Sequence, residues 1–119
     1  MKYSHVFTPI KLNQLTLPNR IYSTAHAEVY SEPGGLPGDR YIRYYEEKAK
    51  GGLGMAICGG SSPVSIDVPQ GAWSPVNLTT DLVIEPLGRL AEACHRHGMK
   101  IMIPTRNAGA VGLRELIRA

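Results

Sequence analysis

The residues best placed to do chemistry follow two strand-like segments of this sequence. His26 ends the first segment, and Gly59-Gly60-Ser61-Ser62 follows the second. If the two strands are parallel, both positions face the rim where such sheets bind ligands. Glycines at that rim let a ligand approach the backbone closely. Each signal also has a structural interpretation, because His26 can be a hydrogen-bonded histidine and the glycines can form a plain strand-exit turn.

Metal binding and phosphate binding find no support in the sequence. His95 and His97 lie two positions apart on a predicted helix, roughly 200° around its axis, so they cannot grip one metal ion. Cys58 and Cys94 fall on different predicted elements, where burial as small apolar side chains is the simplest interpretation. The chain has no GxGxxG or P-loop motif. We therefore predict no metal site, and we assign no catalytic residue.

Three predicted strands alternate with two predicted helices. The strands are expected at 20–25, 53–58 and 99–103, with one helix in each interval. The second strand is continuously apolar, as strands covered on both faces are. This alternation predicts an α/β fold with a parallel sheet. A short hairpin within residues 7–19 is expected to lie across the end of something larger, because an isolated hairpin is marginal in water.

Each predicted helix carries one apolar face. In the first helix, which ends at Gly51-Gly52, Asp39 is the expected N-cap. Pro86 is tolerated only in the first turn of the second helix, which Gly98 ends. The apolar faces are Tyr41, Ile42, Tyr45 and Ala49 in the first helix, and Val83, Leu87, Leu90, Ala91 and Cys94 in the second. Residues 61–79 form an unusually long predicted loop, which favours a functional role.

Composition narrows the class of protein. The chain has 119 residues, 43% hydrophobic and 19% charged, as expected of one globular domain. Its net charge of +3 forms no basic stripe, so nucleic-acid binding has no support. No apolar run approaches the roughly 20 residues that cross a bilayer, and no secretory signal is present. Two cysteines suggest no disulfide framework, so a cytoplasmic location is expected. The oligomeric state is not predicted.

Several stretches resemble the old yellow enzyme family, the NADH:flavin oxidoreductases that use FMN. They are Phe7-Thr-Pro-Ile…Leu-Pro-Asn19-Arg20-Ile21, then Tyr41–Glu47 before Lys48-Ala-Lys-Gly-Gly52, and Leu87–Cys94 before His95-Arg-His-Gly98. The likeness implies a partial (β/α)8 TIM barrel: the N-terminal hairpin, the first three strands and two helices. Residues 1–103 would be the N-terminal part of the FMN-binding domain, and 104–119 an atypical tail.

Within the family, two segments are most similar to the amine-demethylating branch. They are Ser23–Ala27 and Pro33–Gly38, and the branch includes N-methylproline demethylase-like and trimethylamine dehydrogenase-like proteins. The resemblance implies hydride transfer through FMN N5 and oxidative N-demethylation of a small methylated amine. A small-molecule substrate and NAD(P)H are the implied partners. Full-length members of this branch carry an iron–sulfur cluster and a second nucleotide in further C-terminal domains.

The resemblance also implies which residues hold the flavin. Thr24, Ala25, His26 and Ala27 fall where the family's first strand end lines the ring, mainly through backbone groups. Gly60 falls where a small residue after the second strand meets the ring. Small residues permit close packing, and N–H donors aimed at the N5 and O4 edge stabilise the charge that develops there.

Two departures from the family pattern change these expectations. Ala27 stands where trimethylamine dehydrogenase-like members have a cysteine bonded to FMN, so any FMN here would be non-covalent. After the third strand the family reads Gln-Leu-x-His, whereas this chain reads Pro104-Thr105-Arg106-Asn107. Proline has neither an N–H nor a polar side chain, so it cannot make the glutamine's contact with the flavin.

Two other functions stay open. One is a non-catalytic, truncated barrel piece with no bound flavin, since a complete barrel takes about 250 residues and eight strands. Three strands leave unpaired edges, so the chain alone is expected to be inactive and to retain little FMN. The other is enoate (C=C) reduction, with an activated alkene as hydride acceptor.

The family likeness stops abruptly at Ile103, and we hypothesise that residues 104–119 are a frameshifted or misannotated tail. A CCA codon for Pro104, followed by codons for Thr105 and Arg106, reads Gln-Leu one base later. Sequencing the DNA past residue 103 is expected to reveal old-yellow-enzyme codons in another frame. An unbroken frame with no such codons elsewhere would contradict the hypothesis.

Overall fold

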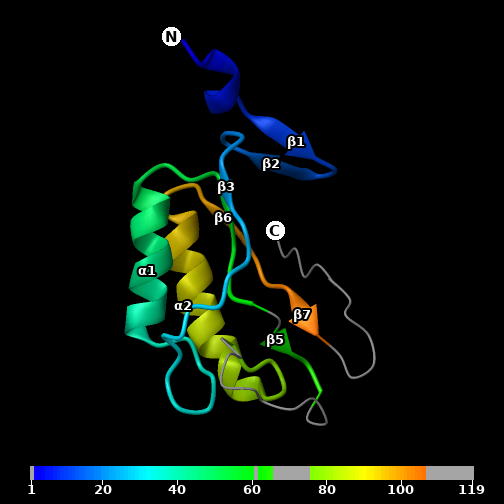
Figure 1. Ribbon diagram of the computed structural model, residues 1–119, viewed down its shortest axis with the longest axis vertical. Helices are drawn as coiled ribbons and strands as arrows, with labels where there is room; N and C mark the ends of the chain where they lie inside the picture. Colours follow the sequence, from blue (N-terminus) through cyan, green and yellow to red (C-terminus); the bar gives the residue numbers. More distant parts are fainter. Residues whose placement is uncertain (1, 61, 66–75, 107–119) are drawn as a thin grey trace.

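The computed structural model describes residues 2–60, 62–65 and 76–106 (Figure 1). Its helices are α1 (Asp39–Lys50) and α2 (Ile84–His95), with the short 3-10 helices η1 (Ser4–Phe7) and η2 (Asp81–Val83). Its strands are β1 (Ile10–Leu12), β2 (Leu15–Leu17), β3 (Tyr22–Ser23), β4 (Met55–Ile57), β5 (Ser62–Pro63), β6 (Lys100–Met102) and β7 (Thr105–Arg106). None of the helices in these ranges is long and apolar enough to cross a membrane.

A three-stranded parallel sheet, in the order β3-β4-β6, forms the centre of the molecule. Met55 pairs with Tyr22 on one side and with Lys100 on the other. This confirms the predicted alternation of strands and helices. The strands are shorter than the expected ranges 20–25, 53–58 and 99–103. All three point the same way, so their C-terminal ends lie at one edge of the sheet.

A second parallel pair, β5 with β7, follows the C-terminal ends of β4 and β6. The sequence did not predict it, because β5 lies in the expected loop 61–79 and β7 follows Pro104. Proline lacks the backbone N–H that would donate to a neighbouring strand, but it keeps a carbonyl oxygen that can accept a hydrogen bond. The Pro104 carbonyl still accepts a hydrogen bond from the Ser62 N–H, at 3.1 Å, so the two chain segments pair again beyond the proline.

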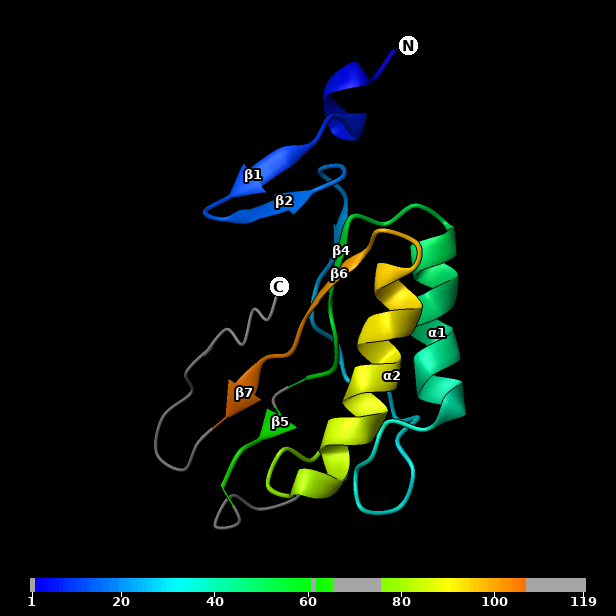
Figure 2. The same cartoon turned by 180° about the vertical axis from the view of Figure 1, so that it is seen from behind.

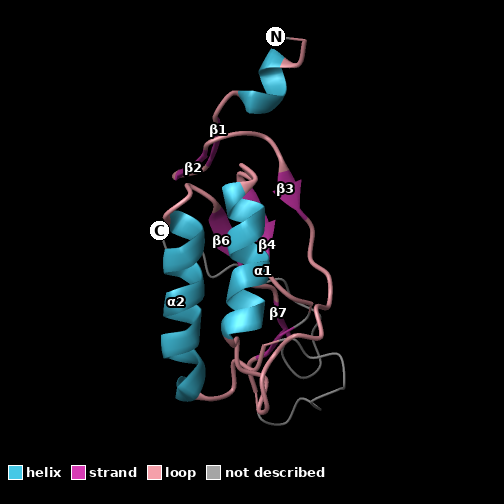
Figure 3. Cartoon of the chain, turned by 90° about the vertical axis from the view of Figure 1, so that its left-hand side faces the viewer, coloured by secondary structure: helices cyan, strands magenta, loops and turns pink. Residues whose placement is uncertain are grey.

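Both helices lie side by side on one face of the sheet (Figure 3). The predicted face of α1 is buried as expected, and α2 buries Leu90, Ala93 and Cys94. Ala56 and Cys58 meet this core from the sheet, and both are fully buried. The prediction for α2 was right at Val83, Leu90 and Cys94, whereas Leu87 and Ala91 are only partly buried.

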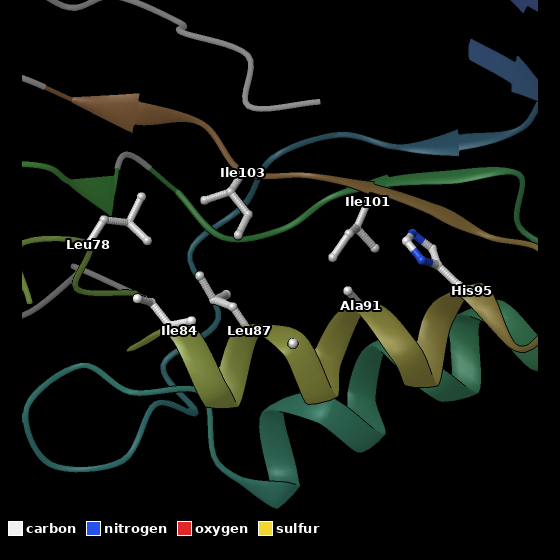
Figure 4. A pocket seen from close by; sticks show the side chains of 8 residues that line it. Leu78, Ile84, Leu87, Ala91, His95, Ile101 and Ile103 are labelled. Carbon is white, nitrogen blue, oxygen red and sulfur yellow. The ribbon is translucent and has the colours of Figure 1, made fainter. Parts of the chain in front are cut away.

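Leu87 and Ala91 are partly buried because they line an apolar groove between α2 and β6 (Figure 4). The groove has a volume of about 510 Å³. Leu78, Ile84, Ile101 and Ile103 complete most of its wall. The outer surface of β6 is therefore only partly covered by α2.

Asp39 is not the N-cap of α1, contrary to the prediction. Gly38 occupies that position and makes no side-chain cap hydrogen bond. Asp39 is the first residue of the helix, and its carboxylate pairs with Arg89 of α2. The carboxylate thus meets a guanidinium on the neighbouring helix, while its charge still suits the positive end of the α1 dipole.

The β1–β2 hairpin lies at the N-terminal end of the parallel strands, as Figures 1 and 2 show. Its turn holds Asn13 at φ 53°, in the left-handed region that asparagine tolerates. A cavity of about 400 Å³ separates the hairpin from the sheet face opposite the helices. The hairpin contributes Ile10, Leu12 and Leu17 to its lining, and the sheet contributes Tyr22, Met55, Ile57 and Met102. The hairpin therefore covers one end of this face.

Leu90→Ala tests the core between the helices and the sheet. Leu90 is fully buried, so its truncation in the full-length gene product should cost about 2–5 kcal/mol of unfolding free energy. Urea denaturation of the variant and the parent gives the difference. Leu82→Ala is the matched control, because Leu82 is 72% exposed and should change stability by less than about 0.5 kcal/mol. Equal effects of the two substitutions would contradict the described packing.

Candidate functional site

His26 lies just beyond β3 with its ring held at both nitrogens. Its side chain is 42% exposed. Nδ1 lies 3.0 Å from the Thr24 carbonyl oxygen, and Nε2 lies 2.8 Å from the Tyr44 hydroxyl of α1. A carbonyl oxygen can only accept a hydrogen bond, so Nδ1 is protonated and its N–H donates a hydrogen bond to the Thr24 carbonyl. These two contacts fix the plane of the imidazole at the end of the strand.

Gly59 turns the chain at the exit of β4. Its φ of 77° lies in the left-handed region, where glycine has no Cβ penalty. Its N–H donates to the Tyr45 hydroxyl at 2.9 Å and points toward Glu28 Oε1 at 3.4 Å. The plain strand-exit turn is therefore present, and Gly60 follows it half-buried.

Glu28 connects these two strand exits. Its side chain is 1% exposed, and Oε1 lies 3.5 Å from His26 Nε2 as well as 3.4 Å from the Gly59 nitrogen. His26 and Gly59 thus lie on either side of one carboxylate, at the C-terminal edge of the sheet. The sequence analysis does not single out Glu28, because it lies just before a segment rich in glycine and proline. The one available signal was an acidic residue between apolar Ala27 and Val29.

Tyr41 of α1 lies close to the Glu28 carboxylate. The pKa of Tyr41 is raised far above its ordinary value, first by burial and then by the negative charge of Glu28. Its hydroxyl therefore stays protonated. Within the residues that the structure describes, the Tyr41 hydroxyl and Glu28 Oε2 make no hydrogen bond of standard geometry, and the interaction of Tyr41 with the Glu28 carboxylate is the one that raises its pKa after burial. The site thus rests on a buried polar layer that is only partly satisfied.

The cysteines near this layer are not activated nucleophiles. Burial raises the pKa of Cys58 well above its usual value, and the nearby Cys94 adds to the effect. Burial likewise raises the pKa of Cys94 to about 12. Both thiols stay neutral near pH 7, so the predicted role as buried apolar side chains is confirmed. The described residues contain no group of three metal-ligating side chains.

The remaining predicted site residues form an exposed strip. Thr24, Ala25 and Ala27 are exposed and lie outside regular secondary structure. Their small side chains leave the backbone accessible on either side of His26. Such a strip, next to the Gly59–Gly60 turn, suits a flat ligand that packs closely against a backbone.

Comparison with known protein families gives one match, which covers nearly the whole chain. Residues 5–116 match the NADH:flavin oxidoreductase / NADH oxidase family. An N,N-dimethylglycine/sarcosine dehydrogenase from Chromohalobacter salexigens is 55% identical over 109 residues, which cover 92% of this chain and 16% of that protein. A multifunctional alkene reductase/demethylase OYE from Caballeronia cordobensis is 40% identical over 104 residues, covering 87% and 15%. The chain thus spans about a sixth of these relatives.

Solved structures show the same fold. The old yellow enzyme from Trypanosoma cruzi matches with a TM-score of 0.77 and 24% identity, covering 94% of this chain and 29% of that one. Morphinone reductase in complex with tetrahydroNAD matches with a TM-score of 0.74 and 26% identity, covering 90% and 28%. These neighbours are TIM barrels, and the described residues form part of such a barrel without closing it. The predicted fold class is therefore confirmed.

Tyr45→Phe tests the hydrogen bond that holds the β4 exit. The substitution removes the nearer acceptor of the Gly59 N–H and leaves Glu28 Oε1 as the remaining one. We expect the unfolding free energy to fall by about 1 kcal/mol, because the Gly59 N–H keeps a longer hydrogen bond and is not left without an acceptor. Urea denaturation of the full-length gene product measures it. Tyr22→Phe is the control, since Tyr22 is 55% exposed, and equal stabilities of the two variants would rule the bond out as a stabilising contact.

Proposed function

Because the chain belongs to the NADH:flavin oxidoreductase / NADH oxidase family, we propose that Thr24–Ala27 and Gly60 hold the flavin ring of FMN. The single observation that carries the proposal is the position of Glu28, which joins the His26 and Gly59 exits into one surface. When bound, FMN supplies two-electron hydride chemistry that side chains lack. The remaining strands and the phosphate site of the barrel would come from sequence outside these residues.

The residues of this strip fit a flat ring. Ala25, Ala27 and Gly60 are small enough for close packing, and no bulky side chain other than His26 projects from the strip. His26 is held in place by Thr24 and Tyr44, so its ring can border the ligand without rearrangement. Ala27 offers no atom for a covalent link, and the flavin would be held non-covalently.

Pro104 makes this site different from the family pattern. Its carbonyl accepts a hydrogen bond from the Ser62 N–H, and the residue is buried. The residue therefore serves the β5–β7 pairing and offers no donor to a flavin edge. The proposed site relies on its other contacts. The rest of the tail, residues 107–119, lies outside the described residues, so the frameshift hypothesis stays a prediction.

We assign the substrate to the class of small N-methylated amines. The dehydrogenase that is 55% identical carries N,N-dimethylglycine and sarcosine in its name, and the chain resembles it across the strip and both helices. For such a substrate, bound FMN would supply the two-electron acceptor for a hydride lost from the N-methyl carbon. Water then adds to the resulting iminium carbon, and the adduct splits into the demethylated amine, formaldehyde and a proton. The iron–sulfur cluster and second nucleotide expected of the branch would be bound by other parts of the protein.

Alkene reduction is the second candidate. The relative that is 40% identical is named both an alkene reductase and a demethylase, which supports alkene reduction as a candidate beside demethylation. NAD(P)H would then be the electron donor and an activated alkene the acceptor. A non-catalytic role, with no flavin bound, is the remaining alternative.

The substrate assignment is tested on the purified full-length gene product. We expect a yellow protein whose flavin stays in the supernatant after acid precipitation, because Ala27 forms no covalent bond. Under anaerobic conditions, sarcosine or N,N-dimethylglycine should bleach the flavin and release one formaldehyde per flavin reduced. Glycine is the matched control, since it lacks the N-methyl group. Bleaching by NADPH with turnover of cyclohexenone, and none by methylated amines, would favour alkene reduction; a colourless protein would contradict both.

A further inference from the structure

We propose that Glu28 is a positioning residue for the flavin: it holds the β3 and β4 exits at a fixed separation and places a negative charge behind the ring. This inference rests on the function proposed above. It concerns a residue that the sequence motifs do not mark, and it does not require Glu28 to touch the flavin.

The geometry of Glu28 is that of a bridge between two loops. Oε1 lies 3.5 Å from His26 Nε2 and 3.4 Å from the Gly59 nitrogen, and these residues are 33 positions apart in the sequence. The β3 exit has no strand pairing beyond Ser23, since β3 ends there. Side-chain contacts therefore hold the loop at 24–28 against the turn at 59–60, and the contacts of Glu28 add to those that Tyr44 and Tyr45 make from α1.

Burial of the Glu28 carboxylate is unfavourable, which indicates that its charge has a role other than packing. A carboxylate removed from water is unfavourable unless it is paired and hydrogen-bonded. Among the described residues Oε2 accepts no hydrogen bond of standard geometry, although the Tyr41 hydroxyl lies close enough to interact with the carboxylate, and Oε1 has only long contacts. An apolar or amide side chain of similar size would fill the same space at lower cost. The charge itself is thus the feature that packing alone does not explain.

A fixed negative charge behind the flavin has a defined consequence. Reduction adds negative charge to the ring, so a nearby carboxylate disfavours the reduced form relative to the oxidised form. Among the described residues, His26 and the Tyr41 hydroxyl interact with this carboxylate, and His26 offsets its charge only when the imidazole is protonated. Glu28 should therefore lower the reduction potential of the bound flavin as well as fix the two loops.

The test uses the full-length gene product with its flavin, and compares Glu28→Gln, Glu28→Ala and the exposed control Glu92→Gln. Glu28→Gln keeps the size and an acceptor but removes the charge. We expect reduced FMN to bind about tenfold more tightly relative to oxidised FMN, which raises the midpoint potential by about 30 mV for a two-electron couple. Glu28→Ala should also weaken binding of oxidised FMN by about tenfold, because the bridge is lost. Glu92→Gln should leave both quantities unchanged.

The outcomes separate the inference from the function on which it rests. If the parent protein binds FMN while Glu28→Gln keeps its potential and Glu28→Ala keeps its affinity, the positioning role is overturned and the proposed function stands. A lower melting temperature in that case identifies Glu28 as structural only. If the parent protein binds no FMN, the proposed function fails and the inference fails with it. If the Glu28→Ala variant does not fold, the midpoint potential of the flavin in the Glu28→Gln variant still tests the proposed role of the charge.

Discussion

Parallel pairing of β3, β4 and β6 is the constraint on which the rest of this structure depends. Parallel strands require a crossover between each pair, and crossovers of one hand place successive helices on the same face. α1 and α2 therefore lie together over Ala56 and Cys58. The same constraint brings the strand exits to one edge. His26 and Gly59 are neighbours because of topology, although α1, β4 and the loops before them separate the two residues in sequence.

The face opposite the helices and the groove beside α2 follow from the same arrangement. Each helix of such a fold packs between two strands, so a strand flanked by one helix stays partly uncovered. Among the described residues α2 is the helix that packs on β6, and Ile101 and Ile103 line the groove of about 510 Å³ (Figure 4). In a complete barrel of this fold the helices form a closed outer ring, and such a ring would cover this groove.

The sequence predicted the parts of the fold that depend on periodicity. The buried face of α1 was predicted completely, because four apolar residues repeat at helical spacing. The prediction that Asp39 is the N-cap of α1 was wrong. Its partner Arg89 lies 50 positions away, so the sequence around Asp39 does not indicate the ion pair. Glu28 was missed for a similar reason. Its neighbours indicated a loop, and only the folded chain brings His26 and Gly59 to its carboxylate. The flavin roles of Thr24, Ala25, His26, Ala27 and Gly60 stay predictions.

α1 explains how loops without regular structure keep a fixed geometry. Tyr44 contacts His26, Tyr45 accepts from the Gly59 N–H, and Lys48 donates to Ser23 Oγ at 3.1 Å. Side chains from one helix, α1, thus fix the positions of both strand exits. Because 12 residues of helix form a stiff unit, a shift of one exit must move α1 or break a contact with the other. The two exits are therefore coupled, and a ligand that spans them meets a surface whose shape is set before it binds.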